Sequence, residues 1–256
     1  MTDRRLHLLV GIIFRDAADT LPVAVDSVLR QESCAAKVTI LLVDDGSTDM
    51  WREALAERLQ RQDIHVRRVV FRSAALARNF VLEEADRAFT DVDYICRLDS
   101  DDVLAGPNVL QHLVGVLERE RPDALLAGNW QVLDGQRLPC PNRATRELLD
   151  ESLLLERLQR MADGDATAEL PSCNTVVRRG LPVRYPLVTS AEDHWYSTTL
   201  LLGQRNWRII VAEDLLFAEY RLRGAMTRRN ANTDAYFRAR RDLLDYARSQ
   251  ISGSEA

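Results

Sequence analysis

The first half of the chain alternates nearly continuous apolar runs with segments whose apolar residues recur at helical spacing. Runs of this kind are typical of strands buried on both faces of a sheet, and they cover residues 6–14, 38–43, 66–71, 94–98 and 124–132. The segments between them predict helices over residues 20–29, 51–59, 74–89 and 107–120. Strands that alternate with helices form right-handed βαβ units. The pattern therefore predicts an α/β fold with a mostly parallel central sheet flanked by helices.

The regular alternation ends after residue 133. Here the sequence predicts a turn, then helices over residues 146–161 and 193–202, and short strands over residues 172–177, 207–211 and 215–220. An amphipathic helix over residues 233–251 closes the chain. Because no repeat or linker divides the sequence, we expect one domain over residues 1–256. Its parts are a first half (1–132), a less regular second half (133–232), and a C-terminal helix with its tail (233–256).

Composition excludes several classes of protein. A chain of 256 residues buries enough surface for a full core without disulfide or metal cross-links. Lysine and arginine total 34 against 39 acidic residues, and the net charge of −5 does not indicate a nucleic-acid partner. Lys37 is the only lysine, which argues against Schiff-base chemistry and Walker-type phosphate loops. Neither a secretory signal nor a membrane-spanning run is expected, so we place the protein in the cytoplasm.

Acidic residues gather where two predicted strands end. Asp44 and Asp45 close the second strand, and Asp99 and Asp101 follow the fourth. Ligands of open parallel sheets bind at the carboxyl ends of the strands. Crowded carboxylates repel one another unless a cation compensates them, and Mg²⁺ or Mn²⁺ takes one or two carboxylates together with water and phosphate oxygens. The Asp99-x-Asp101 spacing therefore predicts a divalent-cation site.

These strings, taken in order, resemble a family-2 glycosyltransferase of the GT-A fold. The resemblance rests on SVLRQ (27–31), LVDDGSTD (42–49), ARN (77–79), RLDSDD (97–102) and ED (192–193). It is close over residues 1–100 and loose in the second half. It implies a metal-dependent, inverting transfer from a nucleotide-diphosphate sugar, with a UDP-sugar as the first expectation and Mn²⁺ or Mg²⁺ as cofactor. Residues 1–132 would bind the nucleotide-sugar and residues 133–232 the acceptor.

The resemblance also implies roles for individual residues. Asp193 would be the catalytic base that deprotonates the acceptor, with Glu192 as the alternative base. Asp99 and Asp101 would serve the ribose and the metal. The expected donor-binding residues are Phe14 beside the base, Asp44 and Asp45 at the base and ribose, Arg78 at a phosphate, and Asp99.

The sequence departs from the family pattern at the end of the first strand. There Ile13-Phe14-Arg15-Asp16 replaces the usual P-x-Y-N string. The Q-x-x-R-W signature and the transmembrane helices of processive relatives are absent, so we expect transfer of a single sugar to a small-molecule, saccharide or lipid-linked acceptor. The arginine-rich loop 221–229 either closes over the diphosphate or is merely solvated. The C-terminal helix either packs on the domain or touches a membrane surface.

Other functions compete with glycosyl transfer. A nucleotidyltransferase uses a similar sheet but usually carries a glycine-rich loop after its first strand, which this sequence lacks. A receiver-like signalling module requires a lysine near a late strand end, where Lys37 does not lie. A catalytically inactive nucleotide-sugar-binding homologue is a further alternative. The sugar, the acceptor, the nucleobase and the oligomeric state stay open at this stage.

Overall fold

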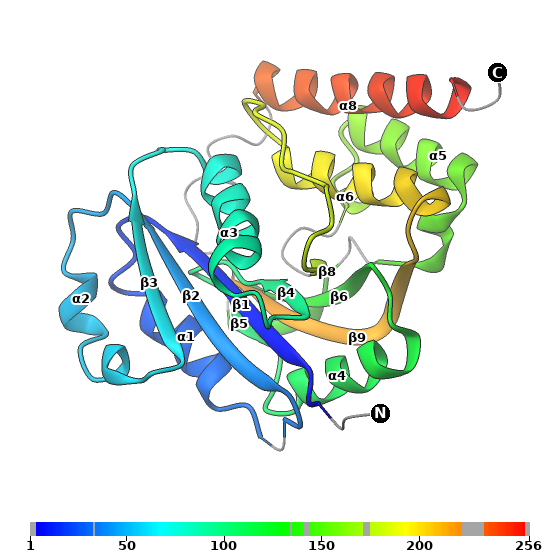
Figure 1. The fold of residues 1–256 in the computed structure, drawn as a ribbon. Helices are drawn as coiled ribbons and strands as arrows, with labels where there is room; N and C mark the ends of the chain where they lie inside the picture. The colour runs from blue at the N-terminus through cyan, green and yellow to red at the C-terminus, as the bar shows by residue number, and fades with distance from the viewer. Residues whose placement is uncertain are drawn as a thin grey trace.

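A single nine-stranded sheet forms the centre of the molecule, with helices on both sides (Figure 1). The computed structural model describes residues 4–32, 34–133, 135–140, 144–170, 175–221 and 233–253. The strands are β1 (His7–Phe14), β2 (Lys37–Asp45), β3 (Ile64–Val69), β4 (Tyr94–Arg97), β5 (Val103–Leu104), β6 (Ala124–Leu133), β7 (Gln136–Pro139), β8 (Thr175–Arg178) and β9 (Ile209–Arg221).

The sheet order is β3-β2-β1-β4-β8-β6-β9-β5, with β7 beside β6. The pairs β3–β2, β2–β1, β1–β4 and β6–β9 are parallel. Strand β8 lies antiparallel between β4 and β6, and β5 and β7 are antiparallel to their neighbours. The predicted α/β fold with a mostly parallel sheet is confirmed, and strands of the second half of the chain extend the sheet begun by the first.

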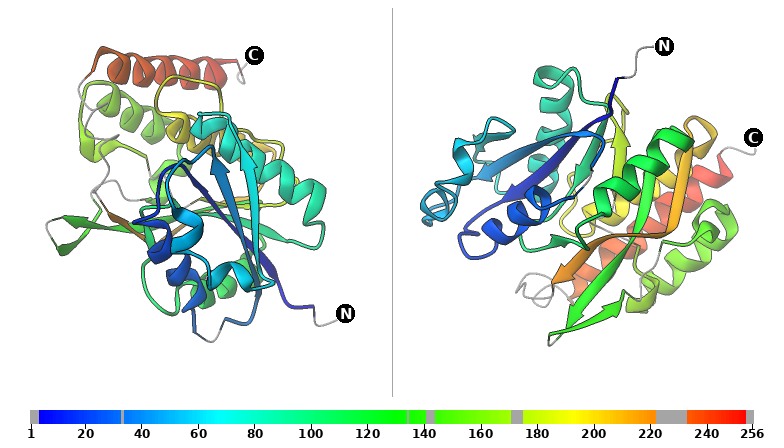
Figure 2. Two further views of the ribbon diagram at one scale, coloured as in Figure 1. Left: turned by 90° about the vertical axis from the view of Figure 1, so that its left-hand side faces the viewer. Right: turned by 90° about the horizontal axis from the view of Figure 1, so that it is seen from below.

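Helices cover both faces of this sheet (Figures 1 and 2). Side chains from α1 and α4 share one core with Leu8, Val10 and Ile12 of β1, whereas α3 packs with Leu9 on the opposite face. Because successive β1 residues enter opposite cores, the strand is an uninterrupted apolar run from Leu8 onward. The helices are α1 (Leu21–Leu29), α2 (Trp51–Ala54), α3 (Ala74–Ala88), α4 (Val109–Glu120), α5 (Glu151–Ala162), α6 (Glu192–Leu202) and α8 (Asp234–Ser252).

The two short strands predicted over residues 207–211 and 215–220 are one long strand, β9. Its register against β6 jumps from Ala212 to Leu216, opposite Ala127 and Gly128. The exposed Glu213 and Asp214 lie in this irregularity, where a bulge leaves extra residues unpaired and bends the strand. Two acidic residues in a bulge look like a turn in the sequence, which is why the prediction divided the strand.

Two predicted helices are shorter than expected. The segment 51–59 contains only α2 and a 3₁₀ turn, Arg58–Gln60. The segment 146–161 divides into a 3₁₀ turn at Arg146–Leu149 and α5, because Asp150 adopts an extended conformation and caps α5 by accepting the N–H of Ser152. An aspartate at this position starts a new helix rather than continuing the old one.

The apolar face of α8 packs on α5 and α6, above the sheet in Figure 1. Its buried residues are Ala239, Arg240, Leu243, Leu244 and Ala247. Within the described ranges, no helix combines the length and the apolarity that a membrane crossing requires. Apart from Arg221, the arginine-rich loop lies outside the described residues.

Candidate active site

The carboxylate of Asp45, at the end of β2, organises the connection from β3 to α3. One oxygen accepts the backbone N–H groups of Phe71 (2.6 Å) and Arg72 (2.8 Å), and the other accepts that of Ser73 (3.0 Å). Arg72 has a positive φ of 53°, a conformation that costs energy in a non-glycine residue. Asp45 therefore holds a strained turn just before Ser73 caps α3. Its expected role toward the ribose or base stays a prediction.

Asp44 is fully buried at the same strand end. Its Oδ1 accepts the N–H of Ser47 at 2.7 Å, and its Oδ2 lies 3.3 Å from the guanidinium of Arg68. The turn between them includes Gly46, whose φ of +78° suits glycine. Asp44 thus shapes the loop after β2, and its expected contact with the nucleotide is likewise untested.

The remaining polar residues of the VDDGSTD string bind the loop that follows β1. Asp16 donates its N–H to the Ser47 hydroxyl at 2.9 Å, and its carboxylate accepts the Thr48 N–H at 2.7 Å. Asp49 accepts the N–H of Ala18 at 2.7 Å. The Thr48 hydrogen bonds lower the pKa of Asp16 despite some desolvation. The first two strand ends are therefore joined by direct hydrogen bonds, an arrangement that the sequence analysis missed.

Phe14, the expected neighbour of the base, is 4% exposed. Its ring packs edge-on against Trp51, with ring centroids 4.8 Å apart. The guanidinium of Arg52 lies over the ring of Trp51, 4.4 Å from its centroid. Phe14 therefore forms a buried aromatic pair with Trp51, which begins α2 after the loop that follows β2. Its expected place beside the base stays a prediction.

Asp99, just past the end of β4, is bound on both oxygens by Arg97. The two contacts measure 3.0 Å (Nε to Oδ1) and 2.7 Å (Nη2 to Oδ2), a two-pronged geometry that is among the stronger ion pairs. Arg78 of α3 approaches Oδ1 at 3.6 Å. Burial disfavours the charged form of Asp99, but the two arginines outweigh it and hold the pKa of Asp99 below its ordinary value. Asp99 is therefore ionised and already neutralised.

Asp101 has the opposite character. Burial and the nearby Asp99 carboxylate raise the pKa of Asp101 above its usual range. No described residue forms an ion pair with it, and no three His, Cys, Asp or Glu side chains of the described chain are close enough together to hold a metal by themselves. A partly buried carboxylate that neither arginine of the cluster contacts directly fits a divalent ion that takes one protein ligand and completes its shell with phosphate and water. Of the two predicted metal ligands, Asp101 fits better, because Arg97 already engages both oxygens of Asp99.

The first turn of α6 lies next to the cluster that Asp99 forms with Arg97 and Arg78. Arg78 bonds Glu192 at 2.5 Å while facing Asp99, so it connects the two elements. Asp193 is desolvated, but His194, Arg97 and Arg78 more than compensate, and its pKa lies well below the ordinary value. Its Oδ1 also accepts the His194 N–H at 2.9 Å. The structure thus brings Asp99, Arg78 and Asp193 together, as a shared site requires, and keeps Asp193 ionised at neutral pH.

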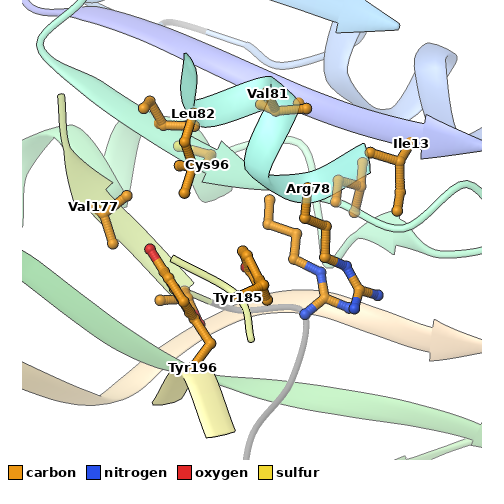
Figure 3. A pocket seen from close by; sticks show the side chains of 13 residues that line it. Ile13, Arg78, Val81, Leu82, Cys96, Val177, Tyr185 and Tyr196 are labelled. Atoms are coloured by element: carbon orange, nitrogen blue, oxygen red, sulfur yellow. The ribbon is translucent and has the colours of Figure 1, made fainter. Parts of the chain in front are cut away.

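A cavity of about 390 Å³, counting its open mouth, lies beside these arginines (Figure 3). Its wall is mostly apolar and comes from β1, α3, β4 and β8, with Tyr185 and Tyr196 stacked 4.0 Å apart on one side. Asn79 fixes Tyr185 by donating to its carbonyl (2.8 Å) and accepting its N–H (2.7 Å). The asparagine of the ARN string therefore attaches the tyrosine segment to α3, and Arg78 beside it faces the charged cluster.

Two residues of this cluster were missed by the sequence analysis. Arg97 was visible as a charge inside a buried strand, which is unusual unless a partner neutralises it. Tyr185 carries no comparable signal, because its position depends on a contact with Asn79 more than a hundred residues earlier in the chain.

Comparison with solved structures shows which fold this chain has. S. aureus TarS residues 1–349 in complex with UDP matches with a TM-score of 0.68 at 17% identity, covering 94% of this chain and 65% of that one. The same fragment in complex with UDP-GlcNAc gives 0.67 at 16%, covering 96% and 72%. Mannosyltransferase PcManGT from Pyrobaculum calidifontis, in complex with GDP-Man and Mn²⁺, gives 0.59 at 15%, covering 99% and 76%. At these identities the likeness shows the fold alone, which is that of GT-A glycosyltransferases.

The family follows from a sequence comparison. A family model described as "Glycosyl transferase family 2" matches residues 9–181, more than half of the chain. The chain therefore belongs to glycosyl transferase family 2, as the motifs predicted, and the nucleotidyltransferase and signalling alternatives are set aside. Asp193 and α8 lie beyond the matched residues. The chain spans 65% of the TarS fragment bound to UDP and 43% of the longer TarS structure. No curated protein matches it in sequence.

Proposed function

We propose that this glycosyltransferase transfers one sugar, with inversion, from a nucleotide-diphosphate sugar to a hydroxyl group of its acceptor. The observation that carries the proposal is the shared cationic environment of Asp99, at the end of β4, and Asp193, at the start of α6. The UDP, UDP-GlcNAc and GDP-Man in the TarS and PcManGT structures support a nucleotide-sugar donor. A UDP-sugar is our first expectation.

Asp193 is the proposed general base. Its depressed pKa keeps the carboxylate deprotonated, as a base requires. In the transfer, the acceptor oxygen forms a bond to the anomeric carbon while the bond from that carbon to the diphosphate oxygen breaks. The bonding electrons leave with the nucleoside diphosphate, and the acceptor proton passes to Asp193.

Asp101 is the proposed ligand of Mn²⁺ or Mg²⁺, with Asp99 beside it. When bound, the ion would neutralise charge that develops on the leaving diphosphate. Arg78 and Arg97 supply fixed positive charge at the same edge of the sheet. We propose that Asp44 and Asp45 face the nucleotide at the loop that they organise. Phe14, packed against Trp51 next to this loop, is proposed to lie beside the base.

The acceptor side is proposed from the chain's second half. Residues 133–232 contain α6 with its base, and β8, which contributes to the cavity wall. A small molecule, a saccharide or a lipid-linked acceptor fits this proposal. We also propose a single, non-processive transfer and a cytoplasmic enzyme, as expected from the sequence.

The proposed base is tested with Asp193→Asn. We expect UDP binding, measured by calorimetry, to match the wild type, because the variant keeps the donor site. Release of UDP from a panel of UDP-sugars in the presence of mixed acceptors should slow about 10²-fold or more. Asp242→Asn, at an exposed position of α8, is the matched control. Wild-type rates in Asp193→Asn would assign the base to another residue.

The proposed metal ligand is tested with Asp101→Asn. Calorimetric titration of UDP with and without Mn²⁺ should show metal-enhanced binding in the wild type and none in the variant. The physical reason is the loss of a carboxylate whose oxygens are not taken up by Arg97, unlike those of Asp99. Normal Mn²⁺-dependent affinity in Asp101→Asn would contradict the assignment.

A further inference from the structure

Arg240 is an arginine on the buried face of α8, only 4% exposed. Arginine is rarely buried to this extent unless it is paired. Its guanidinium donates a hydrogen bond to Glu169 and lies 3.2 Å from the ring of Tyr236, whose hydroxyl donates to the same Glu169 oxygen. The C-terminal helix therefore docks through a polar cluster as well as through apolar packing.

The second oxygen of Glu169 lies near α6. It lies 3.9 Å from Nε2 of His194, a side chain that is itself almost completely buried. His194 immediately follows Asp193 and donates its backbone N–H to the Asp193 carboxylate. A continuous series of contacts thus leads from the C-terminal helix to the proposed base.

We propose that Arg240 is a positioning residue for Asp193, acting through Glu169 and His194. The inference rests on the proposed function, because it assigns α8 a part in orienting that base. With Arg240 in place, Glu169 has a guanidinium on one oxygen and an imidazole near the other. Without it, the largely buried Glu169 carboxylate loses its guanidinium partner, and the nearby His194 imidazole is drawn toward it as a replacement polar partner. That movement displaces the first turn of α6, on which Asp193 lies.

The test compares Arg240→Met with Arg240→Lys. Methionine keeps most of the side-chain volume and removes the charge, whereas lysine keeps the charge. We expect kcat to fall about 10-fold or more in Arg240→Met, because small misplacements of a catalytic group cost up to about 10²-fold. The donor KM and the UDP dissociation constant should stay unchanged, and Arg240→Lys should recover most of the loss. Arg241→Met, an exposed position on the same helix, should behave as wild type.

Two further measurements cover the case in which Arg240→Met folds poorly. Glu169→Gln keeps the size and an acceptor for Tyr236, so it should fold and still lower kcat. Hydrogen exchange of the backbone N–H groups of residues 192–195 should accelerate in both variants, whether or not the enzyme is turning over. Unchanged exchange, a kcat within twofold of the wild type, or a lysine variant as impaired as the methionine variant would overturn the inference. Faster exchange with no sugar transfer by the wild type would instead count against the proposed function.

Discussion

Replacing Arg97 with methionine probes the ion pair at the centre of the site. Arg97 is the last residue of β4, its side chain is 9% exposed, and it bonds both oxygens of Asp99. Methionine fills a similar volume beside the cavity but cannot compensate the carboxylate. The substitution therefore isolates the charge from the packing.

The expected loss of stability follows from the burial of the pair. Removing one partner of a buried ion pair costs about 3–5 kcal/mol, because the other charge stays buried without compensation. Arg78, 3.6 Å from Asp99, supplies part of the missing charge, so the lower end of that range is expected. For a chain of this size about 1 kcal/mol corresponds to about 2–4 °C in Tm, so a loss of about 3 kcal/mol gives a decrease of about 6–12 °C.

Thermal melts and urea titrations of Arg97→Met and Arg119→Met provide the comparison. Arg119 pairs with Glu120 on the surface, with its side chain 67% exposed, and such pairs contribute about 0–1 kcal/mol. If Arg97→Met were destabilised no more than Arg119→Met, the Arg97–Asp99 pair would contribute no more to stability than a surface pair, and the reasoning would be refuted. The double variant with Asp99→Asn should recover part of the loss, since it removes the orphaned charge.

Two further predictions concern pH and packing. Because His194, Arg97 and Arg78 lower the pKa of Asp193, the proposed base stays ionised as pH falls through the ordinary carboxylate range. The acid limb of kcat that belongs to Asp193, measured at saturating donor and Mn²⁺ so that Asp101 does not limit the rate, should therefore lie below that range and move upward in Arg97→Met. An acid limb above pH 6 that Asp193→Asn abolishes would contradict this. Gly11→Ala places a Cβ 2.5 Å from a methyl carbon of Val81, so overpacking should lower the free energy of unfolding by about 1–3 kcal/mol, measured by thermal melts. Gly106→Ala, whose Cβ would meet nothing within 4 Å, is the control, and equal Tm values for the two variants would refute the reasoning.

The fold was largely predictable because its central strands are buried on both faces. Runs such as residues 8–14 have no polar interruption that would confuse them with loops. The predicted element boundaries were wrong where polar residues change the course of the backbone. Asp150 starts a new helix, and Glu213 and Asp214 fit into a bulge of a continuous strand. Those outcomes depend on tertiary pairing, which the local pattern does not contain.

The sequence predicted residues of the candidate site but not their partners. Asp99 came from the acidic strand ends and Asp193 from the family resemblance, and the structure brings both near Arg78, while their roles stay predictions. The partners themselves are distant in sequence: Arg78 bonds Glu192 more than a hundred positions away. The docking of Arg240 on Glu169 is equally invisible in the sequence, because a basic residue on an amphipathic helix normally indicates a solvated face.

The three hydrogen bonds that Asp45 accepts from the loop before α3 bear on how activity is inferred from sequence in this kind of enzyme. A chain that had lost its affinity for the donor would still need this carboxylate to build the turn. Retention of the paired acids after the second strand is therefore a marker of correct folding as much as of catalysis. Asp101, the proposed metal ligand, accepts no such set of backbone hydrogen bonds from a neighbouring loop among the described residues, so its retention would be the more informative sign when active and inactive chains must be told apart.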